Sequence, residues 1–538
     1  MSIKTFEIIM TMSTYAKEKS DERPVALELR GINKRFGAVH ANKDICLKIP
    51  AGTIHGIIGE NGAGKSTLMN IIYGFYTADK GEILIDGIER KLANSKEAIS
   101  YGIGMVHQHF MLVDNFTVLE NVILGAEEGG LLKPSLRKAR KELERLAKEY
   151  QLDVPLDSLI EELSVGLQQR VEILKALYRG AKILILDEPT GVLTPQETEH
   201  LFHIFDALRA QGVTILLITH KLKEILSATD NVSVMRQGEM VAHRETAHTN
   251  KEELAELMVG RKVRLKAEKS DAHPTEVLLS THQLTYTDSM GVDRLKEVSI
   301  EIKAGEVVGV AGVSGNGQSE LLSALAGLIT PTRGSIKIGD KVIDANNPTC
   351  ADGMRKLKVG HIPEDRLVMG LIKSFTAEES AILGHHNQSQ YNGVLLNKPK
   401  YINAECKRLM DEWDVRPRDP KLKSSLFSGG NQQKLIIARE VDQDPDILLI
   451  GQPTRGVDIG AIEFIHKRII ELREQGKGIL LVSVELDEVM SLADRIIVMF
   501  DGHVVGEIDA NKADEKTLGM MMANILPDEL AADNGGQQ

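Results

Sequence analysis

The chain contains two glycine-rich segments of the same design, and only the first keeps the lysine that such segments use to hold phosphate. Residues 59–66 read Gly-Glu-Asn-Gly-Ala-Gly-Lys-Ser, the full pattern of a phosphate-binding loop (P-loop). Residues 312–319 keep the glycines and the serine but carry Gln318 in place of the lysine. Such a loop needs a buried strand before it and a helix after it, so each segment constrains its surroundings to an α/β arrangement.

The two segments belong to a repeat of a whole domain. Three pairs of positions are each 264 residues apart: Ser164 and Ser428, Glu188 and Gln452, and His220 and Val484. Lys65 and Gln318 are 253 apart, so the second copy has gained about eleven residues between its glycine loop and Ser428. A constant offset with one local shift is typical of a duplicated domain with a loop insertion.

Strand-like and helix-like segments alternate in the same order in both copies, which predicts α/β domains with mostly parallel sheets. Buried strands are expected at 53–58, 183–186 and 213–218, and again at 306–310, 447–450 and 478–482. Helices are expected at 66–73, 139–150, 251–258 and 321–328. The expected boundaries are a flexible leader over 1–24, a first domain over 25–248, a linker helix and polar linker over 249–276, a second domain over 277–527 and a disordered tail over 528–538.

Composition narrows the class of protein. No apolar run approaches the roughly 18 residues that span a bilayer, and Lys4, Glu7 and Lys17 interrupt the only apolar stretch near the start, which excludes a secretory signal. The net charge of -12 argues against nucleic acid as a partner. Three cysteines lie far apart and without CxxC spacing, as expected of thiols in a reducing cytosol: Cys46, Cys350 and Cys406.

The first copy carries a complete set of residues for phosphoryl chemistry. Its glycines allow a concave nest of backbone N–H groups around phosphate oxygens, at the positive end of the following helix. The expected phosphate-binding residues are Gly59, Glu60, Asn61, Gly62, Ala63, Gly64, Lys65, Ser66 and Thr67. Lys65 is expected to clamp the β- and γ-phosphates of ATP, and Ser66 to hold Mg²⁺. The strand over 183–186 ends in two acids, of which Asp187 is expected beside Mg²⁺ and Glu188 beside the attacking water.

A third motif lies between the P-loop and the acidic pair. It reads Leu-Ser-Val-Gly-Leu-Gln-Gln over 163–169 and Phe-Ser-Gly-Gly-Asn-Gln-Gln over 427–433. With these motifs, the chain resembles the ATP-binding subunits of ABC transporters. The resemblance implies two tandem ABC ATPase domains, each with a RecA-like core, an antiparallel β subdomain and a helical subdomain. It also implies that Gln108 contacts Mg²⁺ and takes part in catalysis, that His220 contacts the γ-phosphate, and that Phe36 stacks on adenine. For Phe36, a packed aromatic with no ligand is the alternative.

ABC domains pair head to tail, and the resemblance implies the same for the two domains of this chain. One composite site then combines the first P-loop, Gln108, Asp187, Glu188 and His220 with a second-copy set: Ser428, Gly429, Gly430, Asn431 and Asp458. The other site combines the altered residues of the second copy, Gln318, Glu364, Gly451, Gln452 and Val484, with Ser164, Val165 and Thr194. The altered residues of both copies fall in the same composite site, whereas the residues of the other composite site match the active pattern. We therefore expect one competent and one degenerate ATP site.

The resemblance covers about residues 25 to 525 and is closest to the double ATPases of bacterial simple-sugar and nucleoside importers. The segment Gly-Gln-Pro-Thr-Arg-Gly over 451–456 and the histidines at 107 and 109 favour the nucleoside branch; a pentose or galactose importer is the alternative. The implied partners are two integral-membrane permeases and an external solute-binding lipoprotein, with this chain on the cytoplasmic face of the membrane. His107 and His109 are expected on the surface, and His385 and His386 in a solvated insertion.

A tandem ABC translation factor acting at the ribosome is the alternative from another class of protein. Such factors usually keep two intact catalytic sites and have a long, basic, helical linker. This chain has one intact set of catalytic residues and a short linker, so its sequence favours the transporter.

Overall fold

The computed structural model describes residues 23–37, 39–107, 110–126, 132–190, 193, 195–263, 268–313, 315–393 and 396–525, without the side chains of 132–135 and 195–196. The chain divides into two compact units, residues 1–262 and 263–538, and each is described by itself. The predicted tail and nearly all of the predicted leader lie outside the described residues. Within the described part of the chain, no helix is long and apolar enough to cross a membrane.

The first unit contains two sheets. A four-stranded antiparallel sheet has the order β2-β1-β4-β5, formed by β1 (Val25–Phe36), β2 (Val39–Pro50), β4 (Lys80–Ile85) and β5 (Ile88–Glu89). A six-stranded sheet has the order β10-β9-β3-β8-β7-β6, formed by β3 (Ile54–Gly59), β6 (Ile103–Val106), β7 (Ile183–Asp187), β8 (Thr214–Ile218), β9 (Asn231–Arg236) and β10 (Glu239–Glu245). All neighbours in the second sheet are parallel except β9 and β10. The carboxyl ends of β3, β7 and β8 therefore meet at one edge.

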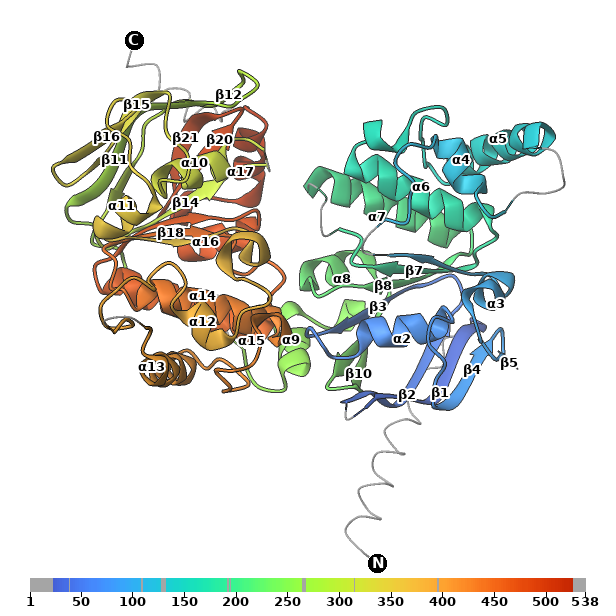
Figure 1. The fold of residues 1–538 in the computed structure, drawn as a ribbon. Helices are drawn as coiled ribbons and strands as arrows, with labels where there is room; N and C mark the ends of the chain where they lie inside the picture. The colour runs from blue at the N-terminus through green and yellow to red at the C-terminus, as the bar shows by residue number, and fades with distance from the viewer. Residues whose placement is uncertain are drawn as a thin grey trace, which may run out of the picture. The chain divides into compact units, whose positions relative to one another are not determined.

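The helices of the first unit occupy different parts of the fold. In Figure 1, α2 (Lys65–Ile72) lies between the two sheets, where its apolar side chains join a core shared by both. The helical part of the unit is formed by α4 (Val118–Ile123), α5 (Leu132–Glu149) and α6 (Val165–Tyr178). The remaining helices are α3 (Ser95–Ser100), α7 (Pro195–Ala210), α8 (Leu222–Ala228) and α9 (Lys251–Val259).

The second unit repeats both sheets. Its antiparallel sheet has the order β12-β11-β15-β16, with β13 also paired to β11; the strands are β11 (Val277–Thr287), β12 (Asp293–Val298), β13 (Glu301–Lys303), β15 (Arg333–Ile338) and β16 (Lys341–Asp344). Its six-stranded sheet has the order β17-β18-β19-β14-β20-β21, formed by β14 (Val307–Ala311), β17 (Val359–Ile362), β18 (Ile447–Gly451), β19 (Gly478–Val482), β20 (Arg495–Phe500) and β21 (His503–Asp509).

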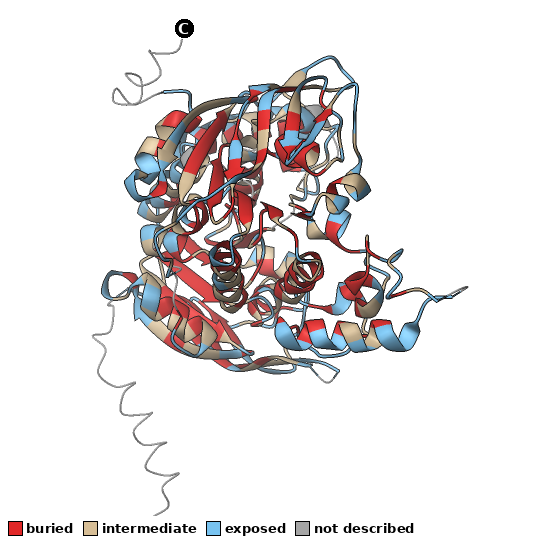
Figure 2. Ribbon diagram, turned by 90° about the vertical axis from the view of Figure 1, so that its left-hand side faces the viewer, coloured by how far each residue is buried: buried red, intermediate tan, exposed pale blue. Residues whose placement is uncertain are grey.

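The helices of the second unit are arranged like those of the first. They are α10 (Gln318–Leu325), α11 (Ala351–Lys356), α12 (Ala377–Ala381), α13 (Pro399–Glu412), α14 (Gly429–Val441), α15 (Ile459–Glu474), α16 (Leu486–Leu492) and α17 (Glu515–Met522), with a π-helical turn η3 (Arg366–Gly370) after β17. One core joins α10 to both sheets, and another packs α14 to α17 against the opposite face of the six-stranded sheet. The central strands are buried on both faces, which explains why they read as continuous apolar runs (Figure 2).

The two-domain α/β fold predicted from the sequence is confirmed, but the interpretation of one histidine pair is wrong. His386 is exposed as expected, whereas His385 is buried. The Nε2 atom of His385 lies 3.7 Å from Oε2 of Glu440, which is itself buried in α14. A buried carboxylate needs compensating partners, and His385 provides one of them. His107 is half-buried and stacks on Phe75, with ring centroids 5.6 Å apart, and His109 lies outside the described residues.

Candidate functional site

The first P-loop joins the end of β3 to the start of α2. Gly64 is the N-cap of α2 with a φ of 100°, and a Cβ atom there would lie 2.2 Å from the Ala41 carbonyl oxygen. A Cβ atom at Gly59 would lie 2.4 Å from the Met235 carbonyl oxygen. Only glycine fits these two positions, because the first needs a left-handed backbone and both need close approach of main chains. Asn42 donates from Nδ2 to the Gly64 carbonyl at 3.1 Å and supports the loop from β2.

Lys65 lies folded into this loop. Its ammonium group donates to the carbonyl oxygens of Gly59 at 2.6 Å and Glu60 at 3.1 Å, and only 6% of the residue is exposed. Burial lowers the pKa of Lys65, while the nearby carboxylates Glu188 and Asp187 raise it. A buried cation held in a nest of backbone groups is the arrangement that receives the charged phosphates of a nucleotide.

Two carboxylates lie at the end of β7, near Lys65. Burial, followed by the charge of Glu188, raises the pKa of Asp187 to about 6. Glu188 has a positive φ of 49° and accepts a hydrogen bond of 2.8 Å from Nδ1 of His220, which lowers the pKa of its carboxyl group. Its backbone N–H donates to the Ile218 carbonyl at 2.8 Å, which ties the end of β7 to that of β8. The structure therefore brings Lys65, Asp187, Glu188 and His220 together.

Fewer contacts are seen for the remaining site residues that the sequence predicts in the first copy. Ser66 is exposed in the first turn of α2, beside the half-buried Thr67. Phe36 ends β1 with 43% of its surface exposed, and its ring packs edge-on against Tyr76 with centroids 5.2 Å apart. Phe36 therefore keeps exposed ring surface despite that packing. Gln108 and Thr194 lie outside the described residues.

The third motif of the second copy forms the start of α14. Ser428 is the N-cap, and its Oγ accepts from Asn431 Nδ2 at 2.8 Å and from the Asn431 backbone N–H at 3.5 Å. Asp458 is the N-cap of α15, and its Oδ1 accepts from the Ala461 N–H at 2.9 Å. A Cβ atom at Gly430 would lie 2.8 Å from Asp458 Oδ2, so these two helix starts are packed tightly together.

The second glycine loop keeps a side-chain contact of the first loop without the lysine. Gln318 donates from Nε2 to the Val313 carbonyl at 3.1 Å, the position that corresponds to Glu60 in the first loop. Gln452 has a φ of 47°, like Glu188, and its backbone N–H donates to the Val482 carbonyl at 2.8 Å. In the first copy, His220 contacts Glu188. At the corresponding place in the second copy, the backbone N–H of Val484 donates to Gln452 Oε1 at 3.3 Å. The scaffold is retained although the charged groups have been lost.

The space left by Gly451 is partly filled. A Cβ atom at Gly451 would lie 2.5 Å from Cγ of Glu364, so the Glu364 side chain passes over the position where the first copy has Asp187. The sequence placed Glu364 near the degenerate site but did not indicate this packing against Gly451, because the two residues are 87 positions apart.

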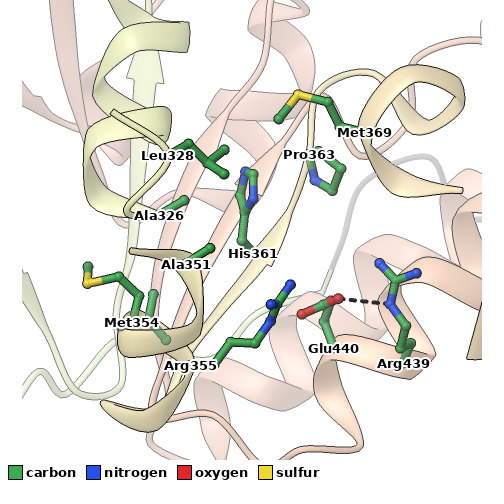
Figure 3. Close-up of a pocket in the computed structure, with 11 residues that line it drawn as sticks. Ala326, Leu328, Ala351, Met354, Arg355, His361, Pro363, Met369, Arg439 and Glu440 are labelled. Carbon is green, nitrogen blue, oxygen red and sulfur yellow. Dashed lines mark hydrogen bonds and ion pairs between the residues drawn. The ribbon is translucent and has the colours of Figure 1, made fainter. Parts of the chain in front are cut away.

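A separate cavity of about 100 Å³ in the second unit is lined by residues of β17, α11 and α14, among others (Figure 3). Its polar lining includes Arg355, His361 and the buried ion pair of Arg439 and Glu440, whose Nε and Oε1 atoms are 2.9 Å apart. Burial lowers the pKa of His361 to about 4. Burial also opposes ionisation of Glu440, but the charges of Arg439 and His385 outweigh it and lower the pKa to about 2. This cavity does not include the P-loop, so it is not the phosphate-binding site.

The supporting roles of several residues were not found from the sequence. Asn42 behind the P-loop is one. Glu224 is another: it is buried, accepts a hydrogen bond of 3.0 Å from Thr219 and is also bonded to Thr190, so it connects the segments after β7 and β8. Arg366 is a third. Hydrophobic periodicity carries no signal for such residues, since their partners are distant in sequence. Among the described residues, no group of three or more His, Cys, Asp and Glu could hold a metal ion by itself.

Comparison with protein families agrees with this geometry. The family model described as "ABC transporter" matches residues 42–191 and 295–455. The nucleoside import ATP-binding protein NupA of Lactococcus lactis subsp. cremoris (strain MG1363) is 45% identical over 92% of this chain and 97% of its own length. The guanosine import ATP-binding protein NupO of Bacillus subtilis (strain 168) is 44% identical over 95% and 99%. The glucose import ATP-binding protein TsgD13 of Haloferax volcanii is 41% identical over 92% and 95%.

A solved structure supports the tandem fold. The archaeal ribosome recycling factor aABCE1, solved in complex with the ribosomal stalk protein aP1, covers 92% of this chain and is itself covered to 92%, with a TM-score of 0.61 and 21% identity. At that identity, the likeness concerns the fold alone. The family match and the near-full-length relatives decide the assignment: the chain belongs to the ABC transporter family, among the tandem ATP-binding subunits of nucleoside and sugar importers, and is an ABC-type ATPase.

Proposed function

We propose that this chain is the ATP-hydrolysing, energy-coupling subunit of an ABC importer for nucleosides, with one competent and one degenerate ATP site. The observation that carries the proposal is the gathering of Lys65, Asp187, Glu188 and His220 at one edge of the first six-stranded sheet. The nucleoside branch is supported by two relatives named for nucleoside and guanosine import, at 45% and 44% identity over nearly their whole length.

At the competent site, each residue has a definite task. The P-loop amides and Lys65 hold the β- and γ-phosphates, and Phe36 offers its exposed face to adenine. Glu188 takes the proton of the attacking water as general base, and His220 orients that carboxylate and contacts the γ-phosphate. In this assignment, the general base Glu188 and the phosphate-binding Lys65 belong to the same domain.

Magnesium fits the donor set at this site. A hydroxyl (Ser66), a carboxylate (Asp187) and an amide oxygen (Gln108) are the oxygen ligands that Mg²⁺ prefers. When bound, Mg²⁺ neutralises charge that develops on the phosphate oxygens. Burial and the charge of Glu188 raise the pKa of the half-buried Asp187 to about 6, and a nearby cation would stabilise its ionised form.

The second copy completes the competent site in this proposal. We assign to it Ser428, Gly429, Gly430, Asn431 and Asp458, through head-to-tail pairing of the two domains. Gly429 and Gly430 form the first turn of α14, and the backbone N–H groups at a helix N-terminus stabilise anions. The other composite site combines Gln318, Gln452 and Val484 with Val165. It lacks both the lysine charge that would hold phosphate and the general base.

The rest of the assembly follows from the importer proposal. We assign two membrane permeases and an external solute-binding lipoprotein as partners, with this chain peripheral on the cytoplasmic face and no nucleic acid bound. The domain boundaries are those given by the sequence, 25–248 and 277–527, with the linker over 249–276. The division of the chain after Lys262 falls inside that linker.

Uptake of labelled solutes tests the transport proposal. A strain that lacks this gene is complemented with the wild-type chain or with Lys65→Ala, and uptake of labelled nucleosides, ribose and glucose is measured. Nucleoside uptake restored by the wild-type chain and not by Lys65→Ala is the expected result. Restoration of sugar uptake alone would assign the chain to the sugar branch, which the relative named for glucose import at 41% identity favours as the second candidate. No restored uptake of any of these solutes would overturn the proposal.

A further inference from the structure

Arg366 joins three segments of the second unit that are far apart in sequence. It begins the π-helical turn η3, four residues after β17. Its Nε donates to Gln432 Oε1 in α14 at 3.3 Å. Its Nη1 donates to the Arg455 carbonyl, and its Nη2 to the Gly456 carbonyl at 3.4 Å. One guanidinium group therefore connects the segment after β17, the first turn of α14 and the loop that leads to Asp458.

Gly429 is adapted to this arginine. A Cβ atom at Gly429 would lie 2.7 Å from Arg366 Nη2 and 2.8 Å from the Gly456 carbonyl oxygen. Real Cβ atoms essentially never approach other atoms so closely, so a side chain at 429 forces the guanidinium or the loop to move. The glycine is therefore required by a contact within the second unit, in addition to any approach of phosphate.

The first copy lacks both members of this pair. With the alignment that places Gln108 opposite Glu364, Phe110 stands opposite Arg366, and Val165 stands opposite Gly429. Phenylalanine cannot donate the three hydrogen bonds, and valine occupies the space that the guanidinium needs. The arginine is thus found in the copy whose Ser428–Gly430 segment is intact, and is missing from the copy whose corresponding segment is altered.

We propose that Arg366 is a positioning residue for ATP hydrolysis, which holds Ser428–Gly430 and the Asp458 loop in one fixed arrangement. The inference rests on the proposed function, because it is the composite site that brings these segments to the nucleotide bound at Lys65. Arg366 itself touches no phosphate in this account. It acts through the Gly456 and Arg455 carbonyls and through Gln432, whose own Nε2 donates to the Ser424 carbonyl at 2.9 Å.

The geometry explains why an arginine performs this task. A guanidinium group is planar and offers five donors in a rigid fork, so it can bind two consecutive carbonyls and a side-chain amide at once. A lysine offers donors from a single nitrogen and cannot span the same three acceptors. Hydrogen bonds from a charged donor are also about twice as strong as neutral ones, which limits relative movement of the two helix starts.

Steady-state kinetics of the full-length chain test the proposal through Arg366→Met and Arg366→Lys. A displacement of about 1 Å in a catalytic group costs on the order of 100-fold in rate, so we expect kcat for ATP to fall by about tenfold or more in Arg366→Met. Arg366→Lys should lie between that variant and the wild type. The apparent affinity for trinitrophenyl-ATP should stay close to wild type, because the first P-loop is unchanged.

The matched control is Arg333→Met, which removes an exposed arginine of the same unit, 3.5 Å from Asp293, and should leave kcat unchanged. The proposal is overturned if kcat is unchanged in Arg366→Met, or if kcat, nucleotide affinity and melting temperature all fall together in both Arg366 variants. Failure of the proposed function is a separate observation: Glu188→Gln would then retain ATP hydrolysis whatever Arg366 does.

Discussion

At the scale of single residues, the two P-loops show that a loop can keep its fold and lose its charge. Lys65 and Gln318 both donate to the backbone carbonyl five positions earlier, Glu60 in one copy and Val313 in the other. The substitution therefore removes the cation without removing that contact. Motif comparison predicted the lost charge, but it could not predict the retained hydrogen bond, because that bond depends on the path of the backbone.

The three thiols should differ in reactivity. Cys46 and Cys350 are exposed, whereas Cys406 is buried in α13, and burial raises its pKa to about 12. The reactive species is the thiolate, and a raised pKa leaves less of it at every pH below that value. A chromogenic disulfide reagent at pH 8 should modify two thiols in the native protein and the third only after denaturation. Rapid modification of all three in the native state, or a Cys406→Ser variant that loses one of the two rapidly released equivalents, would contradict this.

The buried ion pair in α14 should matter for stability. Glu440→Gln leaves Arg439 without its charged partner in a buried position, and breaking such pairs costs about 3–5 kcal/mol. Because the pKa of Glu440 is lowered to about 2, its contribution is present above the ordinary glutamate pKa and is lost only as the pH falls toward 2. Thermal unfolding at pH 7 should show a clearly lower transition for Glu440→Gln. Glu412→Gln, which alters an exposed ion pair with Arg408, is the control and should change little.

At the scale of elements, the two copies begin α6 and α14 in the same way. Ser164 accepts from the Leu167 N–H at 3.4 Å, and Ser428 from the Asn431 N–H at 3.5 Å. The buried strands and the helix after each P-loop could be predicted from the sequence, because hydrophobic periodicity is a local signal. The contacts of Asn42, Glu224, Arg366 and His385 could not, since each joins segments that become neighbours only after folding.

The two caps provide a pair of corresponding variants. Ser164→Ala and Ser428→Ala each remove the N-cap hydrogen bond to the backbone, at a cost of about 0.5–2 kcal/mol to the helix, and Ser428→Ala also removes the bond from Asn431 Nδ2, so both should lower stability. Only Ser428→Ala should lower the ATP hydrolysis rate, because the proposed competent site uses the second copy's segment. Measured rates that fall equally in both variants, or only in Ser164→Ala, would contradict the assignment of that segment to the competent site.

At the scale of the whole molecule, the two copies of the domain keep one fold while their motif residues differ. Both units keep the same sheets, the same positive φ at Glu188 and Gln452, and the same backbone bond from that residue to the neighbouring strand. The side chains at the motif positions differ between the copies. These differences are the ones expected if each ATP is bound by residues of both copies. The account therefore predicts that all turnover depends on the first P-loop and its acids.

The rate of phosphate release by Glu188→Gln tests this claim most directly. The substitution keeps size and hydrogen-bonding capacity but removes the base, which typically contributes about 10²–10⁴-fold. Gln452→Asn is the control, because asparagine tolerates the positive φ at that position. Nearly all hydrolysis should be lost in Glu188→Gln, and Gln452→Asn should keep a near wild-type rate; substantial hydrolysis remaining in Glu188→Gln would contradict the dependence of turnover on the first P-loop and its acids.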